Sequence, residues 1–233
     1  VTGVTYRNPA MLAKMVTTLD VISHGRAILG IGAAWYDVEH VGYGFDYPSD
    51  RERLDRLEEA VQICRAMFRD ERPTFTGSFY RTDDARNVPK PLQPGGPPIM
   101  IGGGGEKRTL RLVAQYADMC NVSGGPETVR HKFDVLRAHC ADVGRDPAEI
   151  TKTRMGTLVL TAGADETARV RGFLSGLAGD QFDEQFTVGE ADEVVAAVEA
   201  LLAAGVEYPI FNMPLSDPET VAQAGELLTK TFA

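Results

Sequence analysis

Short apolar runs alternate along this chain with longer segments in which apolar residues recur every three or four positions. The runs predict buried strands, and the spaced positions predict helices with one apolar face. Strands are expected at residues 1–3 (a stub), 26–32, 98–101, 118–122, 154–160 and 208–213. Helices are expected at residues 9–24, 50–68, 109–117, 126–143, 164–177 and 191–204, and from residue 218 onward.

A strand followed by a helix, repeated through the chain, indicates a parallel sheet with helices on its faces or outside it. One hairpin, expected at residues 75–83, interrupts this order. No linker divides the sequence, so a single α/β domain over residues 1–233 is expected. Doubly wound sheets and (β/α)8 barrels both fit, and the barrel fits better because candidate ligand loops follow nearly every strand.

Two segments lack a clear period. Residues 33–48 are expected to form a long loop, and the segment after residue 177 is expected to be irregular. The first carries a concentration of aromatic residues: Trp35, Tyr36, Tyr43, Phe45 and Tyr47. A loop of this length is either functional or disordered, and its aromatic content favours a packed, functional loop.

A run of glycines, Gly102, Gly103, Gly104 and Gly105, separates a predicted strand from a predicted helix. Residues without a Cβ atom let backbone N–H groups approach an anion, and the first turn of the helix adds more N–H groups. Lys107, Arg108 and Arg111 add positive charge nearby. A flexible turn is the alternative, but it would need fewer glycines.

The glycine run lacks residues that two well-known phosphate-binding motifs require. It does not end in the Gly-Lys-Ser/Thr of a P-loop. The next strand is not followed by an acidic residue suited to a ribose, as the Rossmann fingerprint requires. The remaining interpretation is a phosphate site of the kind that binds flavin-like cofactors in barrel proteins.

Charge and composition exclude other classes of protein. The net charge is −9 and the pI is about 5.0, and no Lys/Arg-rich run occurs, which argues against a nucleic-acid partner. Cys64, Cys120 and Cys140 are expected to be reduced thiols of a cytoplasmic protein. No apolar run approaches the ~20 residues of a membrane span, and no signal peptide is recognised.

The histidines differ in what they suggest. His40, with Glu39 before it, lies after a predicted strand, where barrel enzymes carry their chemistry, so it is either a site residue or part of a helix start. His24 precedes a strand and is expected to be structural, whereas His131 and His139 are expected to face solvent. Neither a metal-ligand cluster nor a Gly-x-Ser-x-Gly motif is present, so no metal site is expected.

Several motifs together resemble one family. The sequence Thr2-Gly3-Val4-Thr5-Tyr6-Arg7-Asn8-Pro9 is very similar to a signature of luciferase-like flavin or deazaflavin oxidoreductases. The same is true of Gly25-Arg26-x-x-Leu29-Gly30-x-Gly32-Ala33-x-Trp35, Tyr43-Gly44, Arg53-x-x-x-Leu57-Glu58-Glu59-Ala60 and Pro98-Ile99-x-Ile101-Gly102-Gly103-Gly104-Gly105. The resemblance covers essentially the whole chain and looks closest to the branch that uses coenzyme F420, a deazaflavin.

The resemblance implies a (β/α)8 barrel of the bacterial luciferase-like type, usually a homodimer. It places the cofactor phosphate on the loop Gly102, Gly103, Gly104, Gly105, with Thr109 assisting. It places the ring over Val1, Thr2 and Gly3 and beside Gly32, Ala33, Ala34 and Trp35. Asn121 is expected near the cofactor tail.

Two departures from the family pattern affect the expected chemistry. The first two strands of the family barrel, and most of the third, have no counterpart here, so the chain is expected to be a fragment or a reduced barrel. Trp35 stands where some F420 dehydrogenases have an acidic residue. Glu39 or His40 is the expected replacement as the catalytic acid or base.

The function expected from this resemblance is an F420-dependent oxidoreductase. Such an enzyme transfers a hydride between the deazaflavin and an unidentified small organic substrate. One alternative is an FMN-dependent luciferase-like monooxygenase that uses the same phosphate site. The other is a truncated, non-catalytic flavin-binding protein.

Overall fold

The computed structural model describes residues 1–232, and its internal contacts group them into two compact units. The first unit consists of Val1–Cys120 and Leu136–Ile150. The second consists of Asn121–Val135 and the chain from Thr151 onward. The expectation of a single domain remains a prediction.

Three parallel strands form the sheet of the first unit. They are β1 (Thr2–Gly3), β2 (Leu29–Gly32) and β5 (Ile99–Gly102), with β2 between the other two. Successive side chains along a strand point to opposite faces. Leu29, Ile31, Ile99 and Ile101 are buried on one face, while the alternate positions 30, 32 and 102 are glycines. One face therefore carries the core, and the glycines of the other face lie under the side chains of Val1 and Met100.

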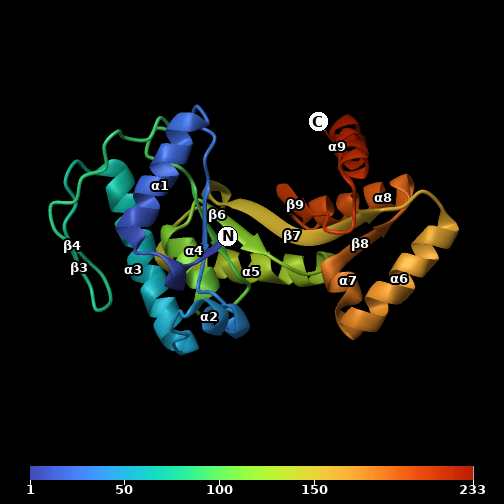
Figure 1. Cartoon of the computed structure of the whole chain (residues 1–233), viewed down its shortest axis with the longest axis horizontal. Coiled ribbons are helices and arrows are strands. Elements are labelled where there is room, and N and C mark those ends of the chain that lie inside the picture. Colours follow the sequence, from blue (N-terminus) through green and yellow to red (C-terminus); the bar gives the residue numbers. More distant parts are fainter. Residues whose placement is uncertain (233) are drawn as a thin grey trace. The chain divides into compact units, whose positions relative to one another are not determined.

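Side chains cap two of the helices in the first unit. They are η1 (Val4–Tyr6), α1 (Pro9–Ile22), α2 (Asp37–Tyr43), α3 (Asp50–Arg69) and α4 (Thr109–Tyr116). The Asn8 side chain accepts from the amides of Ala10 and Met11, and the Ser49 hydroxyl accepts from the Glu52 amide. Helices α1 and α3 lie side by side (Figure 1) and bury the apolar face of α3.

The predicted hairpin is confirmed. Strand β3 (Phe75–Thr76) pairs antiparallel with β4 (Arg81–Thr82). The Glu59 carboxylate on α3 accepts hydrogen bonds from the amides of Ser78, Phe79 and Tyr80. One acidic side chain thus satisfies the backbone donors of the hairpin turn.

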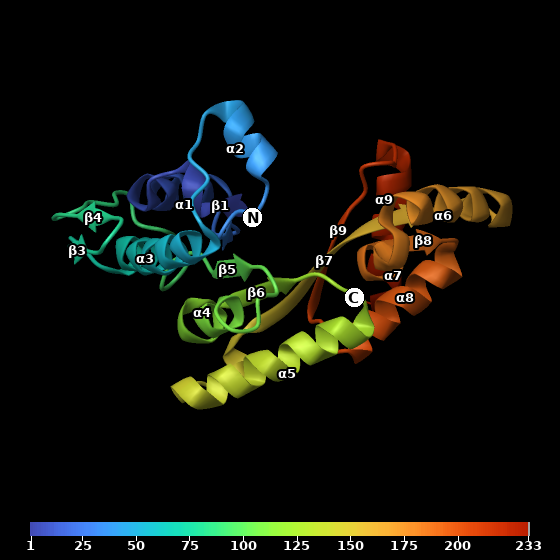
Figure 2. The same cartoon turned by 90° about the horizontal axis from the view of Figure 1, so that it is seen from below.

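In the second unit, the long strand β7 (Thr151–Leu160) pairs in parallel with two shorter strands. Its first half pairs with β9 (Tyr208–Asn212) and its second half pairs with β8 (Phe186–Gly189). Helices α6 (Ala164–Ala178) and α8 (Ala191–Ala203) both contact β8, and α8 also contacts α9 (Pro218–Phe232) (Figure 2). Leu158, Val194 and Ala224 form the centre of one small core, and Val159, Leu174 and Val188 form another.

The remaining elements are β6 (Met119–Val122), α5 (Pro126–Val143) and η2 (Pro147–Glu149). The residues of β6 and α5 are divided between the two units. The strand β6 and the helix α5 were predicted within a residue or two. The Asp146 side chain caps η2 by accepting from the Ala148 amide.

Two expectations about irregular segments were wrong. The segment 33–48 contains the helix α2, which ends at Gly44 in the left-handed conformation. The segment after residue 177 contains η3 (Gly179–Gln181), α7 (Phe182–Gln185) and the strand β8. These elements are short, so they give no readable period, and β8 is set by its pairing with β7.

Across residues 1–232, none of the helices combines the length and the apolar character needed to cross a bilayer. In the same part of the chain, His, Cys, Asp and Glu side chains do not gather in threes with the geometry of a metal site.

Candidate functional site

A row of three glycines crosses the first unit at the carboxyl ends of its strands. Gly3 pairs with Gly32, and Gly32 pairs with Gly102. A Cβ atom on Gly32 would lie 3.3 Å from the Gly102 carbonyl oxygen, and one on Gly3 would lie 2.8 Å from the Tyr6 ring. A larger residue would therefore not fit without movement. The row presents flat backbone at the end of a parallel sheet, where α/β proteins bind ligands.

The conformation and close contacts of the loop after this row require glycine. Gly103 has φ +121°, a conformation that residues with a side chain rarely adopt. A Cβ atom on Gly105 would lie 2.8 Å from the Thr109 Oγ1 atom. Gly103 and Gly105 are exposed, whereas Thr109 is buried and begins α4. The loop thus leaves backbone amides, close to a helix start, accessible to an anion.

The charges around the loop are only partly available to a ligand. Arg108 pairs with Asp55 at 2.6 Å and donates to the Arg51 carbonyl, so its charge is offset within the protein. Lys107 and Arg111 are exposed. The positive potential at this loop therefore comes from backbone dipoles and from these two side chains.

Arg53 holds the segment that follows Gly32. Its guanidinium donates to the carbonyls of Ala33 (3.1 Å) and Pro48 (2.5 Å) and lies 4.0 Å from the centroid of the Tyr47 ring. Ala34 has φ +65°, which is strained for a residue with a side chain. Trp35 is left 80% exposed. The segment is fixed at both ends and presents an aromatic side chain to solvent.

His40 is completely buried, and both of its ring nitrogens have partners. Nδ1 lies 2.7 Å from the Tyr36 carbonyl, and Nε2 lies 2.7 Å from the Thr5 hydroxyl. Because a carbonyl can only accept, Nδ1 carries the proton and Nε2 accepts from Thr5. In this arrangement His40 joins η1 to α2.

Tyr6 and Glu39 form an accessible hydrogen-bonded pair next to the glycine row. The Tyr6 hydroxyl donates to Glu39 Oε2 at 2.6 Å, and this bond to a carboxylate raises the pKa of Tyr6 to about 12. The Tyr6 ring also packs against the rings of His40 and Phe45. The pair places a phenol and a carboxylate beside Gly3.

One protein family accounts for most of the sequence. The model of the family described as luciferase-like monooxygenase matches residues 1–178. The chain belongs to the luciferase-like monooxygenase family.

Solved structures show the fold of this luciferase-like chain. An F420-dependent secondary alcohol dehydrogenase in complex with an F420-acetone adduct superimposes with a TM-score of 0.81 at 20% identity, covering 99% of this chain and 76% of that one. The long-chain alkane monooxygenase LadA does so with a TM-score of 0.79 at 16% identity, covering 99% and 68%. The predicted α/β fold of the luciferase-like barrel type is confirmed.

Curated relatives of this luciferase-like chain include enzymes named for two different cofactors. An F420-dependent glucose-6-phosphate dehydrogenase of Kineococcus radiotolerans is 30% identical over 90% of this chain and 69% of its own length. Another of that name, from Intrasporangium calvum, is 40% identical over 47% of this chain and 31% of its own length. An FMNH(2)-dependent dimethylsulfone monooxygenase of Pseudomonas fluorescens is 31% identical over 57% of this chain and 36% of its own length.

The structure brings most of the expected cofactor residues together in the first unit. These are Val1, Thr2, Gly3, Gly32, Ala33, Ala34, Trp35, Gly102, Gly103, Gly104, Gly105 and Thr109. Val1 lies over Gly30 and Gly102, and the Thr2 hydroxyl accepts from Arg7. Asn121 belongs to the second unit, where it is buried and donates to the Thr153 hydroxyl at 2.7 Å. Cofactor contact by these residues stays a prediction.

Three residues that shape the candidate site were not identified as such from the sequence. Tyr6 lies within a recognised motif, but its bond to Glu39 spans 33 positions. Arg53 likewise reaches back 20 positions to Ala33. His139, expected to face solvent, instead places Nε2 2.7 Å from the Glu106 carbonyl, in the turn after the glycines. Such contacts depend on tertiary folding and leave no local sequence signal.

The bond to Glu39 is expected to make the Tyr6 hydroxyl titrate above its ordinary range. Since the folded-state pKa of Tyr6 is raised from 10.0 to about 12, the pair contributes stability below pH 10 that is lost as the pH rises through about 12. In Glu39→Gln the Tyr6 pKa is expected to fall toward 10. NMR titration of 13C-labelled tyrosine, assigned with Tyr6→Phe, measures both values. Equal pKa values in the two proteins would remove the carboxylate as the cause.

Proposed function

We propose that the chain is the cofactor-binding part of an F420-dependent oxidoreductase, or the whole of one, which transfers a hydride between the deazaflavin and a small organic substrate. The observation that carries this proposal is the glycine row leading into the Gly103–Thr109 turn. It occurs in a chain that is 30% identical, over 90% of its length, to a relative named for F420.

In this proposal the backbone of the first unit does most of the binding. The amides at Gly103 to Gly105 and the start of α4 hold the phosphodiester, with Thr109 fixing the loop from beneath. The flat row Gly3–Gly32–Gly102 accepts the ring edge, and the exposed Trp35 and Tyr43 cover it from water. Bound F420 supplies the hydride chemistry.

Proton handling is assigned to Glu39, one of the two expected catalytic residues. Its carboxylate is partnered by the Tyr6 hydroxyl, which can donate or accept a proton at the same surface. His40, the other expected residue, lies directly behind them with its ring enclosed. We therefore propose that His40 acts through Tyr6 and Thr5, by position, rather than on the substrate.

An FMN-dependent monooxygenase is the second candidate. The observation that favours it is the similarity to the FMNH(2)-dependent relative, whose matched segment overlaps the same family region. FMN ends in a phosphate that the same loop could hold. The third candidate, a chain that binds neither cofactor productively, follows from the share of its relatives that the chain spans.

Titration of the purified chain with each cofactor separates these candidates. F420 is expected to bind with a Kd at least about tenfold below that of FMN, measured by the change in each cofactor's own fluorescence. Tighter binding of FMN would support the monooxygenase. Absence of saturable binding for both would support the non-catalytic alternative and contradict the proposal.

We further propose that the protein is a homodimer that pairs through the outer face of α1. Met11, Met15, Leu19 and Ile22 recur at helical spacing on this face and are 58%, 46%, 57% and 69% exposed. Light scattering after size exclusion is expected to give twice the 25.3 kDa chain mass. Leu19→Glu is expected to give the single mass, with Ala138→Glu, at an exposed position of α5, as the control. A monomeric parent protein would contradict this assignment.

A further inference from the structure

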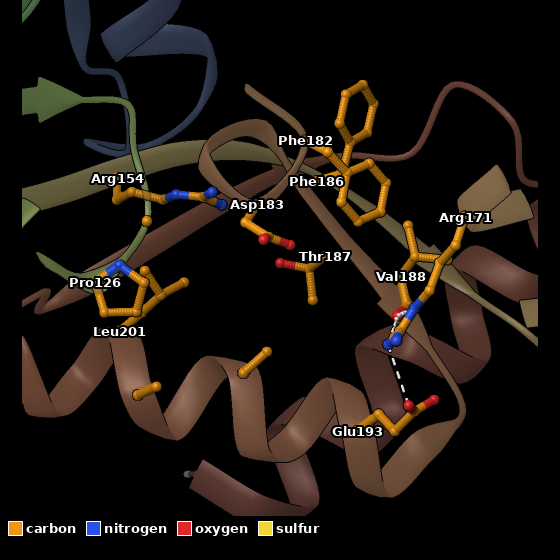
Figure 3. A pocket seen from close by; sticks show the side chains of 13 residues that line it. Pro126, Arg154, Arg171, Phe182, Asp183, Phe186, Thr187, Val188, Glu193 and Leu201 are labelled. Carbon is orange, nitrogen blue, oxygen red and sulfur yellow. Dashed lines mark hydrogen bonds and ion pairs between the residues drawn. The ribbon is translucent and has the colours of Figure 1, made fainter. Parts of the chain in front are cut away.

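The second unit contains a cavity of about 230 Å³ that no part of the proposed cofactor site uses. It lies among β8, α7, α8 and the residues that begin α5, and Figure 3 shows its lining side chains. This volume is below the roughly 300–1,000 Å³ of sites for drug-sized ligands. A ligand of this cavity must therefore be small.

One wall of the cavity holds a buried cation that donates to backbone carbonyls. Arg154 on β7 is 1% exposed. Its Nε donates to the Gly124 carbonyl (3.0 Å) and its Nη2 donates to the Glu184 carbonyl (3.1 Å), both of which are neutral acceptors. Its Nη1 has no hydrogen-bond partner among the described residues. Burial lowers the pKa of Arg154, against the opposing influence of the Glu184 carboxylate.

The backbone around Arg154 is shaped to keep its guanidinium in place. A Cβ atom on Gly156 would lie 1.8 Å from Nη1, so only glycine leaves room for that nitrogen. Gly124, which accepts from Nε, has φ +132°. In Figure 3 the guanidinium end of Arg154 is directed toward the side of the cavity where Asp183 and Thr187 lie. The unpartnered nitrogen is thus part of a built site.

The acidic side chains near the cavity are engaged elsewhere or exposed. Glu184 accepts from the Gly125 amide (2.7 Å) and from the Thr128 hydroxyl (3.1 Å), which caps α5. Glu193 pairs with Arg171 at 3.1 Å and accepts from the Glu190 amide. Asp183 is exposed at the cavity and forms no ion pair with Arg154 within residues 1–232. The charge of Arg154 is therefore offset only by the Glu184 carboxylate, without a direct ion pair among the described residues.

Part of the wall is apolar. The rings of Phe182 and Phe186 stack at 5.7 Å, and Val188, Ala197 and Leu201 complete the surface. One free guanidinium donor suits a monoanion, and the acidic residues nearby disfavour a dianion such as phosphate. The apolar wall suits a compact hydrocarbon body.

We propose that this cavity binds a small monocarboxylate with an aromatic or branched apolar body, whose carboxylate is held by Arg154. The proposal goes beyond the cofactor chemistry and does not depend on it. Two features support it together: a fully buried arginine nitrogen that lacks a partner among residues 1–232, and a partly open cavity beside it.

Benzoate is the probe and benzamide is its neutral isostere. Calorimetric titration of the full chain is expected to show saturable 1:1 binding of benzoate and at least about tenfold weaker binding of benzamide, because only benzoate offers a charged acceptor to Arg154. Arg154→Gln is expected to raise the Kd of benzoate by a similar factor. Arg169→Gln, which removes the same charge from an exposed position on α6, is expected to leave the Kd unchanged.

Two further variants keep Arg154 and test the same site. Ala197→Phe fills the cavity and is expected to abolish benzoate binding. Asp183→Asn removes the exposed carboxylate and is expected to lower the Kd of benzoate by a few fold. The proposal is overturned if benzoate does not saturate the parent chain, if benzamide binds as well, or if Ala197→Phe leaves the Kd unchanged.

Discussion

Replacing Gly103 with aspartate is expected to abolish F420 binding, with a Kd raised by at least about 100-fold. Two effects act together: the carboxylate faces the phosphodiester where backbone amides would bind it, and φ +121° is strained for any side chain. Fluorescence titration of F420 measures the loss. Circular dichroism checks that the variant keeps its helices.

The matched variant Gly103→Asn separates these two effects. Asparagine has nearly the same shape and the same backbone strain as aspartate, so the difference between the two Kd values reports the charge. Gly172→Asp adds the same charge on α6, where a Cβ atom meets nothing within 4 Å. It is expected to leave F420 binding unchanged. An F420 affinity in Gly103→Asp equal to that of the parent would remove this loop from the cofactor site.

Asp20→Ala is expected to lower the free energy of unfolding by about 3 kcal/mol, which is a large effect for the loss of one side chain. Asp20 on α1 is fully buried and accepts from the Leu92 amide (2.7 Å), the Gln93 amide (3.1 Å) and the Gln93 side chain (2.7 Å). Alanine would leave these donors buried without an acceptor. Urea denaturation at neutral pH measures the change.

The pH dependence of the same group gives an independent check. Burial by itself raises the pKa of Asp20, but the hydrogen bonds from Gln93 and Leu92 outweigh it and hold the pKa below its ordinary value. The stability it contributes is therefore present above pH ~4 and is lost as the pH falls below that. Asp20→Asn keeps one acceptor oxygen. Its free energy of unfolding is therefore expected to fall by less than that of Asp20→Ala. A change below about 1 kcal/mol in Asp20→Ala would contradict this role.

Where the sequence carried a local signal, its prediction of the fold was accurate. The spaced apolar residues predicted helices from about residues 9 and 50, and both helices begin there, at the side-chain caps Asn8 and Ser49. The helix α2 and the strand β8 carried no such signal, because seven and four residues are too short to show a period. Their conformations depend on Arg53, Tyr47 and β7, which are distant in the chain.

The candidate site divides in the same way. The run of glycines after a strand predicted a backbone conformation that other residues rarely adopt. Gly103, with its positive φ, has such a conformation. Burial of His40 could not be read, because its position after a strand predicts only which end of the sheet it occupies. Arg154 was missed for a related reason: within an apolar strand, one arginine gives no sign of whether it has a partner.

The most direct measurement of the central claim is hydrogen exchange of the backbone amides with and without F420. If the cofactor phosphate rests on the glycine loop, peptides covering residues 99–112 are expected to exchange at least about tenfold more slowly when F420 is bound. Peptides covering Gly3 and Gly32 are expected to be protected with them. F420 binding that leaves residues 99–112 unprotected would contradict the account.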